Sequence, residues 1–555
     1  MSAGLACLHA GRGRGDVRAA RGGSLATFAA LAAFGAFAAL TTVGALGVSA
    51  CQPVEAAPEA KAKPIPPPAD LMASVALGPT GSLRGLQAYV DAIKPGAGAM
   101  ISDQVVRDGL AKAAGMHSLD GFDPSGWTYV LVADGADTVA LLGKVADAAK
   151  LATSADTAHV MVKGSWAAVG PKALLERFGP YAFAALATQP APPAPTVTVY
   201  LTQVMARHQR EVQGAIAKMQ SSMATFGGTM AQLMTAYIDG FSSLAADTDT
   251  LTIRLEADAD AASLDLSLTP RPKSRLAAFA ALQHPTDYAL LDKLPAASAA
   301  PTMLIGGHLE LGPYHDGIMS AMTAMYGPEA STDLLAAMDT FRKTLTGDFV
   351  MTAQIARGTG ITMTQLYGTT NAGAANKSVA AMLELFKTGR TLTAMNLSTT
   401  ITASPETASH DGVTLRGYDT LADYSKATPA QQQAMDAMMA SGVHRTQIGA
   451  FDAVTMVVVA KDSLAEAKRT IDAARGKAAH FTPAGASGGL LAWSHTRKDS
   501  LAMVMDLGAF LGAMTGKPMA DLPILLALGF ADHNAHIRFA VPAATAQTLM
   551  KSANP

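Results

Sequence analysis

LTIRLEADADAASLDLSL, residues 251–268, alternates apolar and polar side chains on both sides of a polar turn. Apolar residues recur at every second position in 251–255 and again in 263–268, which is the period of a strand with one buried face. The segment between them, 257–262, is rich in Ala and Asp, and a polar break between two such runs favours a chain reversal. We therefore predict an antiparallel hairpin, followed by a helix that begins near Ser274.

The same hairpin and helix recur along the chain. Further copies lie at 159–178, 349–386, 447–474 and 526–551. The chain between 71 and 283 contains four predicted units in order: a strand and helix, a hairpin and helix, a strand and long helix, and a hairpin and helix. The same order recurs between 303 and 551, where an insert lies near 349–445. We predict an α+β fold of two related domains, with hairpins and strands covered by amphipathic helices, produced by an internal duplication. The alternative is that these units are unrelated parts of an ordinary α+β chain.

Prolines mark the boundaries of this organisation. Three prolines interrupt residues 284–301, which we interpret as a linker between a first domain, 71–283, and a second domain, 302–555. Residues 51–70 are also rich in Pro and cannot form a packed element. As a polyproline-like chain this segment reaches on the order of 60 Å, so we predict that it is a tether.

The N-terminus has the layout of an export signal. Four arginines precede an uncharged, apolar run at 25–48: Arg12, Arg14, Arg18 and Arg21. The run is long enough to span a bilayer, so its length alone does not distinguish a cleaved signal from an uncleaved anchor. Both alternatives leave the body of the protein outside the cytoplasm, because the arginines stay on the inner side. We predict that residues 1–50 are a signal peptide.

Residues Val48, Ser49, Ala50 and Cys51 resemble the lipobox of bacterial lipoproteins, in which small residues precede one obligatory Cys. The resemblance implies that Cys51 receives diacylglycerol on its sulfur, becomes the first residue after cleavage and then usually gains an acyl chain on its amino group. Two or three chains hold a protein on a membrane durably, whereas one is marginal. Gln52 after the Cys implies the outer membrane by the same resemblance. The alternative is that Cys51 is an ordinary apolar residue at the end of a membrane helix.

The composition excludes one class of partner. With 42 Lys and Arg against 44 Asp and Glu, the chain has a formal net charge of -2 and no basic excess with which to bind a nucleic-acid backbone. The two cysteines, Cys7 and Cys51, both lie in the N-terminal region, so the body has no disulfide and no Cys-based metal site. No nucleotide or phosphate-binding motif occurs in the body, and we predict no cofactor.

One predicted helix is unusually rich in methionine. Apolar residues recur at helical spacing from Val212 to Leu244, interrupted by two glycines. Such a stripe is usually core packing. Methionine is flexible and polarizable, so the stripe can also line a groove for lipid or apolar peptide. The ligand-binding candidates are Met219, Met223, Phe226 and Met230.

A polar group follows the predicted strand near residue 305. His308 and Glu310 share one strand face by the period of two, and His315 and Asp316 follow a turn. Imidazole and carboxylate groups bind divalent metals, so these four residues are the metal-ligand candidates. The alternative is a solvated strand end.

Two further patterns contain side chains that could carry out chemistry. Ser487 lies in GASGG, residues 485–489, which is close to a nucleophile elbow but is interpreted as a loop because a strand is predicted at 490–493 rather than before it. His533 and His536 are close in sequence but are predicted to be solvated residues of a hairpin turn. Neither pattern supplies a catalytic set, so no catalytic residue is predicted.

The sequence favours a non-enzymatic, lipid-anchored envelope protein that acts as a scaffold or binding module. Its partners would be the membrane, through the lipid, and an envelope protein or hydrophobic ligand. One alternative is a carrier of lipid or apolar peptide through the Met-rich helix. Another is an envelope hydrolase or metal-dependent enzyme.

Lipidation can be tested directly in cells. Labelling with radioactive palmitate is expected to mark the wild-type protein, and Cys51→Ala is expected to abolish the mark because the acceptor sulfur is gone. Cys7→Ala is the matched control and keeps the label. An unlabelled wild type contradicts the lipobox interpretation.

Overall fold

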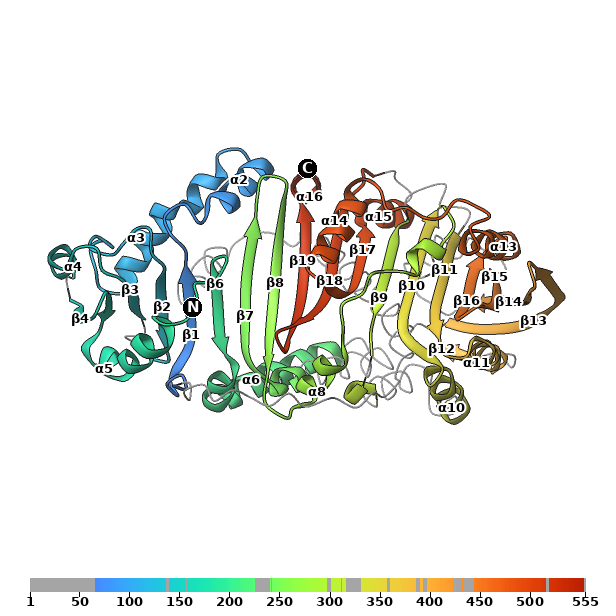
Figure 1. Cartoon of the computed structure of the whole chain (residues 1–555), viewed down its shortest axis with the longest axis horizontal. Coiled ribbons are helices and arrows are strands. Elements are labelled where there is room, and N and C mark those ends of the chain that lie inside the picture. The colour runs from blue at the N-terminus through green and yellow to red at the C-terminus, as the bar shows by residue number, and fades with distance from the viewer. Residues whose placement is uncertain are drawn as a thin grey trace.

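The computed structural model describes residues 65–135, 139–155, 157–224, 240, 242–296, 301–310, 312–315, 331–356, 360–385, 390–392, 397–423, 425, 432, 444–515 and 519–553. Within these residues 19 strands form one sheet, and every neighbouring pair is antiparallel. The sheet runs as a long band across the molecule, with its central strands upright in Figure 1. The fold is therefore α+β, as predicted.

The first half of the chain forms one side of the band. Its strands are β1 (Leu71–Leu77), β2 (Thr128–Ala133), β3 (Val139–Lys144), β4 (His159–Lys163), β5 (Trp166–Gly170), β6 (Thr196–Tyr200), β7 (Thr248–Ala257) and β8 (Ala261–Pro270). From the outer edge inward their order is β4, β5, β3, β2, β1, β6, β7, β8. The hairpin predicted at 251–268 is β7 and β8.

The second half repeats this order. Its strands are β9 (Met303–His308), β10 (Leu345–Ala356), β11 (Gly360–Thr369), β12 (Arg390–Leu392), β13 (Leu397–His410), β14 (Val413–Asp423), β15 (His444–Phe451), β16 (Val454–Ala460), β17 (Asp499–Asp506), β18 (Pro523–Ala531) and β19 (Asn534–Pro542). From β15 inward the order is β15, β16, β11, β10, β9, β17, β18, β19, which matches the first half strand for strand. The second half thus repeats the strand order of the first, and the duplication that would explain it stays a prediction.

The insert in the second half is shorter than predicted. Strands β12, β13 and β14 have no counterpart in the first half and extend the sheet beyond β15. The predicted insert at 349–445 was wrong at its start, because β10 and β11 correspond to the hairpin β2 and β3. That first-half hairpin was not identified from the sequence.

Helices follow the strands in corresponding places in the two halves. Those of the first half are α2 (Arg84–Ile93), α3 (Asp103–Ala113), α4 (Ala148–Ser154), α5 (Lys172–Tyr181), α6 (Leu201–Ala224) and α8 (Arg275–Leu282). Those of the second half are α10 (Ser331–Arg342), α11 (Ala372–Glu384), α13 (Ser463–Ala474), α14 (Gly485–Thr496), α15 (Leu507–Thr515) and α16 (Ala543–Ala553). Short helical turns are η2 (Ala97–Ile101), η3 (Ala182–Leu186), η4 (Leu291–Lys293) and η5 (Gly312–Tyr314). The strand predicted at 490–493 was wrong, because these residues lie in α14.

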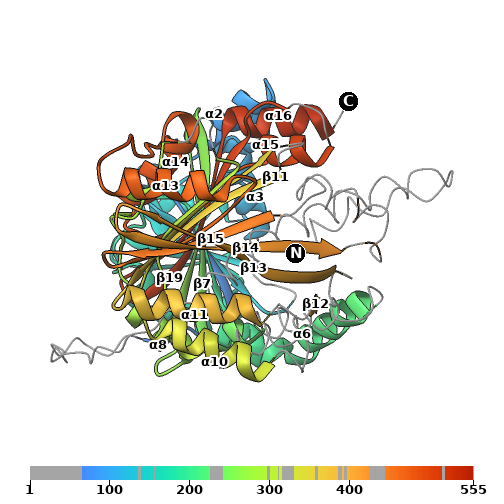
Figure 2. The same ribbon diagram turned by 90° about the vertical axis from the view of Figure 1, so that its right-hand side faces the viewer.

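Both faces of the sheet are covered by helices, as the end-on view in Figure 2 shows for α13 and α14 on one side and α8, α10 and α11 on the other. On the first face, here called the α14 face, Val350 and Val504 of the sheet pack with Leu490 of α14. On the second, the α11 face, Met351 packs with Val379 of α11. Alternate residues of one strand thus enter two cores, which explains why β17 is buried at every position.

The two halves meet where β8 pairs with β19, from Ala261 opposite Pro542 to Leu268 opposite Ala535. Arg538 of β19 crosses this junction and is buried between two carboxylates. Its Nε donates to Asp265 Oδ2 of β8 at 3.3 Å, and its Nη1 donates to Asp499 of β17. A shift of one residue in the β8 and β19 pairing would move Asp265 to the opposite face, so the ion pair fixes the register.

The carboxylates at the junction have shifted pKa values. Burial acts to raise the pKa of Asp265, but the hydrogen bond from His536 and the charge of Arg538 outweigh it and hold the pKa below its ordinary value. Burial raises the pKa of Asp499, although the charge of Arg538 opposes the shift. His536 Nδ1 lies 3.0 Å from Asp265 Oδ1. His536 therefore belongs to β19 and to this cluster, and its prediction as a solvated turn residue was wrong.

The segment between the halves contributes to the core. Residues 284–296 run along the α14 face, and Tyr288, Leu291 and Leu294 are buried there with residues of β9, α13 and α14. Pro295 forms a bridge with His480. The segment that the sequence predicts as a linker is thus packed against the second half.

Gly85 allows α2 to pack against the turn between β7 and β8. A Cβ at this position would overlap the carbonyl oxygen of Ala257, whereas a Cβ at Gly109, in the exposed part of α3, would meet nothing within 4 Å. Both glycines are inside helices, where Gly costs about 1 kcal/mol relative to Ala when no contact intervenes. Substituting Ala at each of the two glycines therefore distinguishes the effect of helix propensity, which both share, from the effect of the packing contact, which only Gly85 makes.

We expect Gly85→Ala to lower the free energy of unfolding by about 1–3 kcal/mol, because the helix must move away from the hairpin. Gly109→Ala is expected to raise it by up to about 1 kcal/mol. Guanidinium unfolding of both variants measures the difference. Equal stabilisation by the two substitutions would show that α2 does not contact the hairpin.

Candidate functional site

A cavity of about 290 Å³ opens on the α14 face, where the segment between the halves crosses the second half of the sheet. Three strands, β9, β10 and β11, form its floor. Its lining residues are Thr286, Asp287, Tyr288, Ala289, Leu290, Leu291, Gly306, Gly307, Asp348, Phe349, Val350 and Gly368. Ligand pockets usually measure about 300–1,000 Å³, so the cavity fits only a small molecule.

Two glycines of β9 allow close approaches at this point of the sheet. A Cβ at Gly306 would lie 3.5 Å from the Tyr288 ring, and a Cβ at Gly307 would overlap the carbonyl oxygen of Ser500 on the neighbouring β17. Gly307 also has a φ of 150°, which side chains disfavour. The missing side chain at Gly306 therefore leaves the space in which Tyr288 lies against the sheet, whereas Gly307 allows the close approach of β9 and β17.

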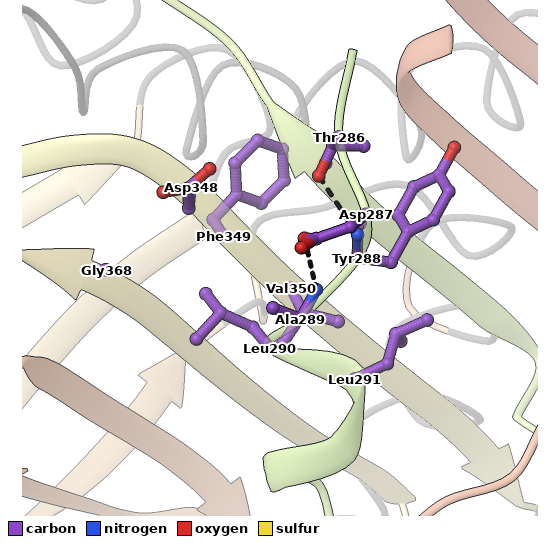
Figure 3. A pocket seen from close by; sticks show the side chains of 12 residues that line it. Thr286, Asp287, Tyr288, Ala289, Leu290, Leu291, Asp348, Phe349, Val350 and Gly368 are labelled. Carbon is purple, nitrogen blue, oxygen red and sulfur yellow. Dashed lines mark hydrogen bonds between the residues drawn. The ribbon is translucent and has the colours of Figure 1, made fainter. Parts of the chain in front are cut away.

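The crossing segment is held by local hydrogen bonds, shown as dashed lines in Figure 3. Thr286 Oγ1 accepts from Tyr288 N at 3.1 Å, and Asp287 Oδ1 accepts from Ala289 N at 3.1 Å. These bonds are typical of Asx and Ser/Thr turns, and they support the left-handed φ of 56° at Tyr288. The carboxylate of Asp287 is thus fixed at one side of the cavity, with Asp348 at the other.

A His and carboxylate cluster lies beside the cavity. His308, at the end of β9, is only 2% exposed, and its Nδ1 lies 3.1 Å from Asp348 Oδ1. Its Nε2 lies 3.5 Å from Glu310 Oε1, and its ring stacks on His284 with centroids 3.6 Å apart. The backbone of Glu310 is held by Gln283, which donates to its carbonyl oxygen at 2.6 Å and accepts from its N at 3.0 Å.

Asp348 connects this cluster to the cavity that it lines. Burial acts to raise the pKa of Asp348, but hydrogen bonds from His308 and Thr346 and the charges of His308 and His284 outweigh it and hold the pKa below its ordinary value. Asp348 is therefore ionised at neutral pH. A carboxylate that orients a His is the geometry of general-base catalysis. Here the His is buried and does not line the cavity, so it cannot contact a bound molecule there.

A second chain of hydrogen bonds leads from the cavity to the junction of the halves. Ser494 Oγ of α14 donates to Asp499 Oδ2 at 2.6 Å, so its own oxygen accepts from the Tyr288 hydroxyl at 3.2 Å. Asp499 in turn pairs with Arg538. Burial raises the pKa of Tyr288 to about 12, so its hydroxyl keeps the proton that this bond requires. A continuous chain of hydrogen bonds therefore joins Tyr288 in the cavity wall to Arg538 at the junction of β8 and β19.

The structure brings together two of the four predicted metal ligands, His308 and Glu310. His315 follows η5, and Asp316 lies outside the described residues. Over the described residues, no group of three His, Cys, Asp or Glu side chains could hold a metal ion. Sequence reasoning missed His284 and Asp348, which come from the crossing segment and from β10. His284 is the first residue of the predicted linker and directly precedes Pro285, but nothing in its spacing indicates that its ring contacts His308.

The other predicted sites have different positions. Met219 and Met223 belong to α6, but their side chains lie outside the described part of the chain, as do the whole residues Phe226 and Met230. Within α6, His208 is non-helical, with φ of -112° and ψ of 25°. Ser487 lies in the first turns of α14. Cys51 precedes the first described residue.

The sequence and the structure were compared with known protein families, curated proteins and solved structures. No known protein family matches the sequence, and no curated protein matches it. Among solved structures, crystal form III of TP0453 matches 47% of this chain and 97% of that chain, with 8% sequence identity and a TM-score of 0.22. So low a TM-score supports no argument about fold or function. No helix among the described residues is long and apolar enough to cross a membrane.

Asp348→Asn tests the ion pair beside the cavity. Folding lowers the pKa of Asp348. The ionised carboxylate therefore stabilises the folded state at pH values above its unfolded pKa of about 3.9, and this stabilisation is lost as the pH falls through its folded pKa. The variant is expected to be less stable than the wild type by under about 1 kcal/mol at pH 7, since the side chain is 45% exposed and solvent screens the pair. Guanidinium unfolding is expected to show this difference shrinking below about pH 4. A difference that is constant with pH contradicts the assignment.

Proposed function

We propose that this chain is a non-enzymatic, lipid-anchored protein of the cell envelope, on the outer membrane, that acts as a binding scaffold. The N-terminal lipobox and Pro-rich tether support the anchoring. The duplicated body supplies a broad and continuous sheet on which a partner can dock. The observation that carries the binding role is an apolar row on the α11 face at the centre of the sheet.

The central apolar row consists of Leu255, Leu264, Phe539 and Leu526, which lie opposite one another on β7, β8, β19 and β18. It therefore crosses the junction of the halves and spans about 14 Å at the usual strand spacing. Leu255 is 39% exposed and Phe539 is 40% exposed, although both are large and apolar. Contiguous apolar surface of this kind marks interaction sites on soluble domains.

Helix α8 limits the row at one end. Leu276 and Phe279 of α8 cover Leu268 and Ile537, which lie further along β8 and β19 on the same face. The row itself has no charged side chain, so it favours a partner that contributes apolar groups and desolvates both surfaces. A protein surface and an acyl chain both meet that requirement.

The second candidate function is a carrier of lipid or apolar peptide. The apolar character of the row supports it, and Met219, Met223, Phe226 and Met230 would add further apolar surface in this proposal. The cavity beside Asp348 does not serve this role, because about 290 Å³ is small for a lipid and two carboxylates line it. The two candidates differ in what contacts Phe539.

Photo-crosslinking in cells distinguishes the candidates. Phe539→p-benzoylphenylalanine places the reactive group in the row, and the same substitution at Val105, which is 53% exposed on α3, is the control. We expect adducts at position 539 and not at 105. A protein adduct supports the scaffold, and a lipid adduct identified by mass supports the carrier. No adduct at 539, or equal labelling at both positions, contradicts both.

A further inference from the structure

The outer end of the first half is formed by a short strand, β4, at the extreme left of the sheet in Figure 1. β4 pairs with β5 on one side, from His159 opposite Gly170 to Lys163 opposite Trp166. Among the described residues no strand pairs with its other side. Such an edge has backbone donors and acceptors that a further strand can use.

The hairpin geometry shows which backbone groups these are. β4 and β5 are joined by the two residues Gly164 and Ser165, and Gly164 has a φ of 63°, as a tight hairpin turn requires. The pair next to such a turn, Lys163 and Trp166, is hydrogen-bonded, and hydrogen-bonded and open pairs alternate along the ladder. Val160 and Val162 therefore direct their N–H and C=O groups toward the outer edge.

The side chains of this edge are apolar and accessible on both faces. Val162 is 52% exposed on the α11 face, and Met161 is 36% exposed on the α14 face. Edge strands in native proteins are usually protected by charges or proline. Here the only charged side chain of β4 besides the ionisable His159 is Lys163. The strand thus combines unpaired backbone with exposed apolar side chains.

The second half shows how the corresponding edge is covered. β15 holds the position of β4 in the repeated strand order, and β14 of the insert pairs with its outer side over His444 to Ile448. One basic residue of β15, Arg445, meets an acidic residue directly opposite on β14: Arg445 Nε lies 2.7 Å from Asp419 Oδ1. This position in the fold therefore accepts an antiparallel strand, with an acidic group opposite a basic one.

The charge around β4 indicates the chemistry of its partner. Residues 157–170, the hairpin and its flanks, contain Lys163 and His159 but no carboxylate. A second copy of the chain, paired antiparallel about Met161, would place Lys163 opposite His159 and supply no negative charge. An extended segment with alternating apolar residues and a flanking Asp or Glu would complement both the apolar side chains and the charge.

We propose that the outer edge of β4 binds an extended, acid-flanked apolar segment of another protein, which adds to the sheet as an antiparallel strand. The main-chain bonds at Val160 and Val162 supply the affinity, and Lys163 selects the acidic flank. This edge is at the opposite end of the first half from the central apolar row, so the proposal does not rest on the function proposed above.

Fluorescence anisotropy tests the proposal with the full-length protein in detergent. The probe is fluorescein-labelled acetyl-Glu-Val-Thr-Val-Thr-Val-Glu-amide, and its control has Lys at both ends. Val162→Pro removes an outward N–H without breaking the pairing with β5, and is expected to weaken binding of the acidic probe about tenfold, the equivalent of one hydrogen bond. Val162→Thr keeps the N–H and is expected to bind within about twofold of the wild type.

Lys163→Glu is expected to reverse the preference between the acidic and basic probes, which a loss of folding would not do. Equal binding of the acidic probe by wild type and Val162→Pro, or no saturable binding by the wild type up to about 1 mM, overturns the proposal. A dimer in light scattering that Val162→Pro abolishes would assign the edge to a second copy and would likewise overturn it.

Discussion

The buried contact of Arg538 with Asp265 and Asp499 is the constraint on which the continuous sheet depends. Three strands, β8, β19 and β17, contribute one residue each, and the single guanidinium contacts both carboxylates in the interior. Arg254 and His536 supply further partners to Asp265. Leaving any member unpaired at this depth would cost several kcal/mol, about 3–5 by comparison with other buried pairs. This contact fixes the register in which β8 pairs with β19, and the pairing of these two strands joins the two halves into one sheet. The hydrogen bonds through Ser494 extend the same cluster to Tyr288 and the cavity wall.

Periodicity predicted the parts of this fold in which one strand face differs from the other. The alternation in 251–268 and 526–541 gave β7 with β8 and β18 with β19. It did not give β2 and β3, because their runs are apolar at nearly every position and are buried on both faces, which removes the period of two. The segment 485–496 was misassigned for a related reason. Its apolar residues suit a short strand, but the segment is a helix whose Leu490 and Leu491 pack between the sheet and the crossing segment.

The candidate site was predictable only within one short stretch of chain, although β9 ends at His308 and Glu310 lies beyond it. The period of two placed His308 and Glu310 together, and their side chains do approach each other. Asp348 and His284 reach the same place from other elements, so their proximity depends on the pairing of β9 with β10 and on the path of the crossing segment. The ion pair of Asp265 with Arg538 joins a strand from the middle of the sequence to the last strand and has no local signal at all. The predicted lipid attachment at Cys51 and the methionines beyond Ala224 lie outside the described residues.

The order in which the strands occur along the chain has a consequence for biosynthesis. β8 is complete at Pro270, but its neighbour β19 is the last strand in the sequence and ends at Pro542. While the polypeptide is still emerging from the ribosome, the inner side of β8 has no native neighbour, and Asp265 has Arg254 of β7 beside it but still lacks Arg538. The backbone hydrogen bonds on the inner side of β8 can therefore form only after nearly the entire chain has been synthesised.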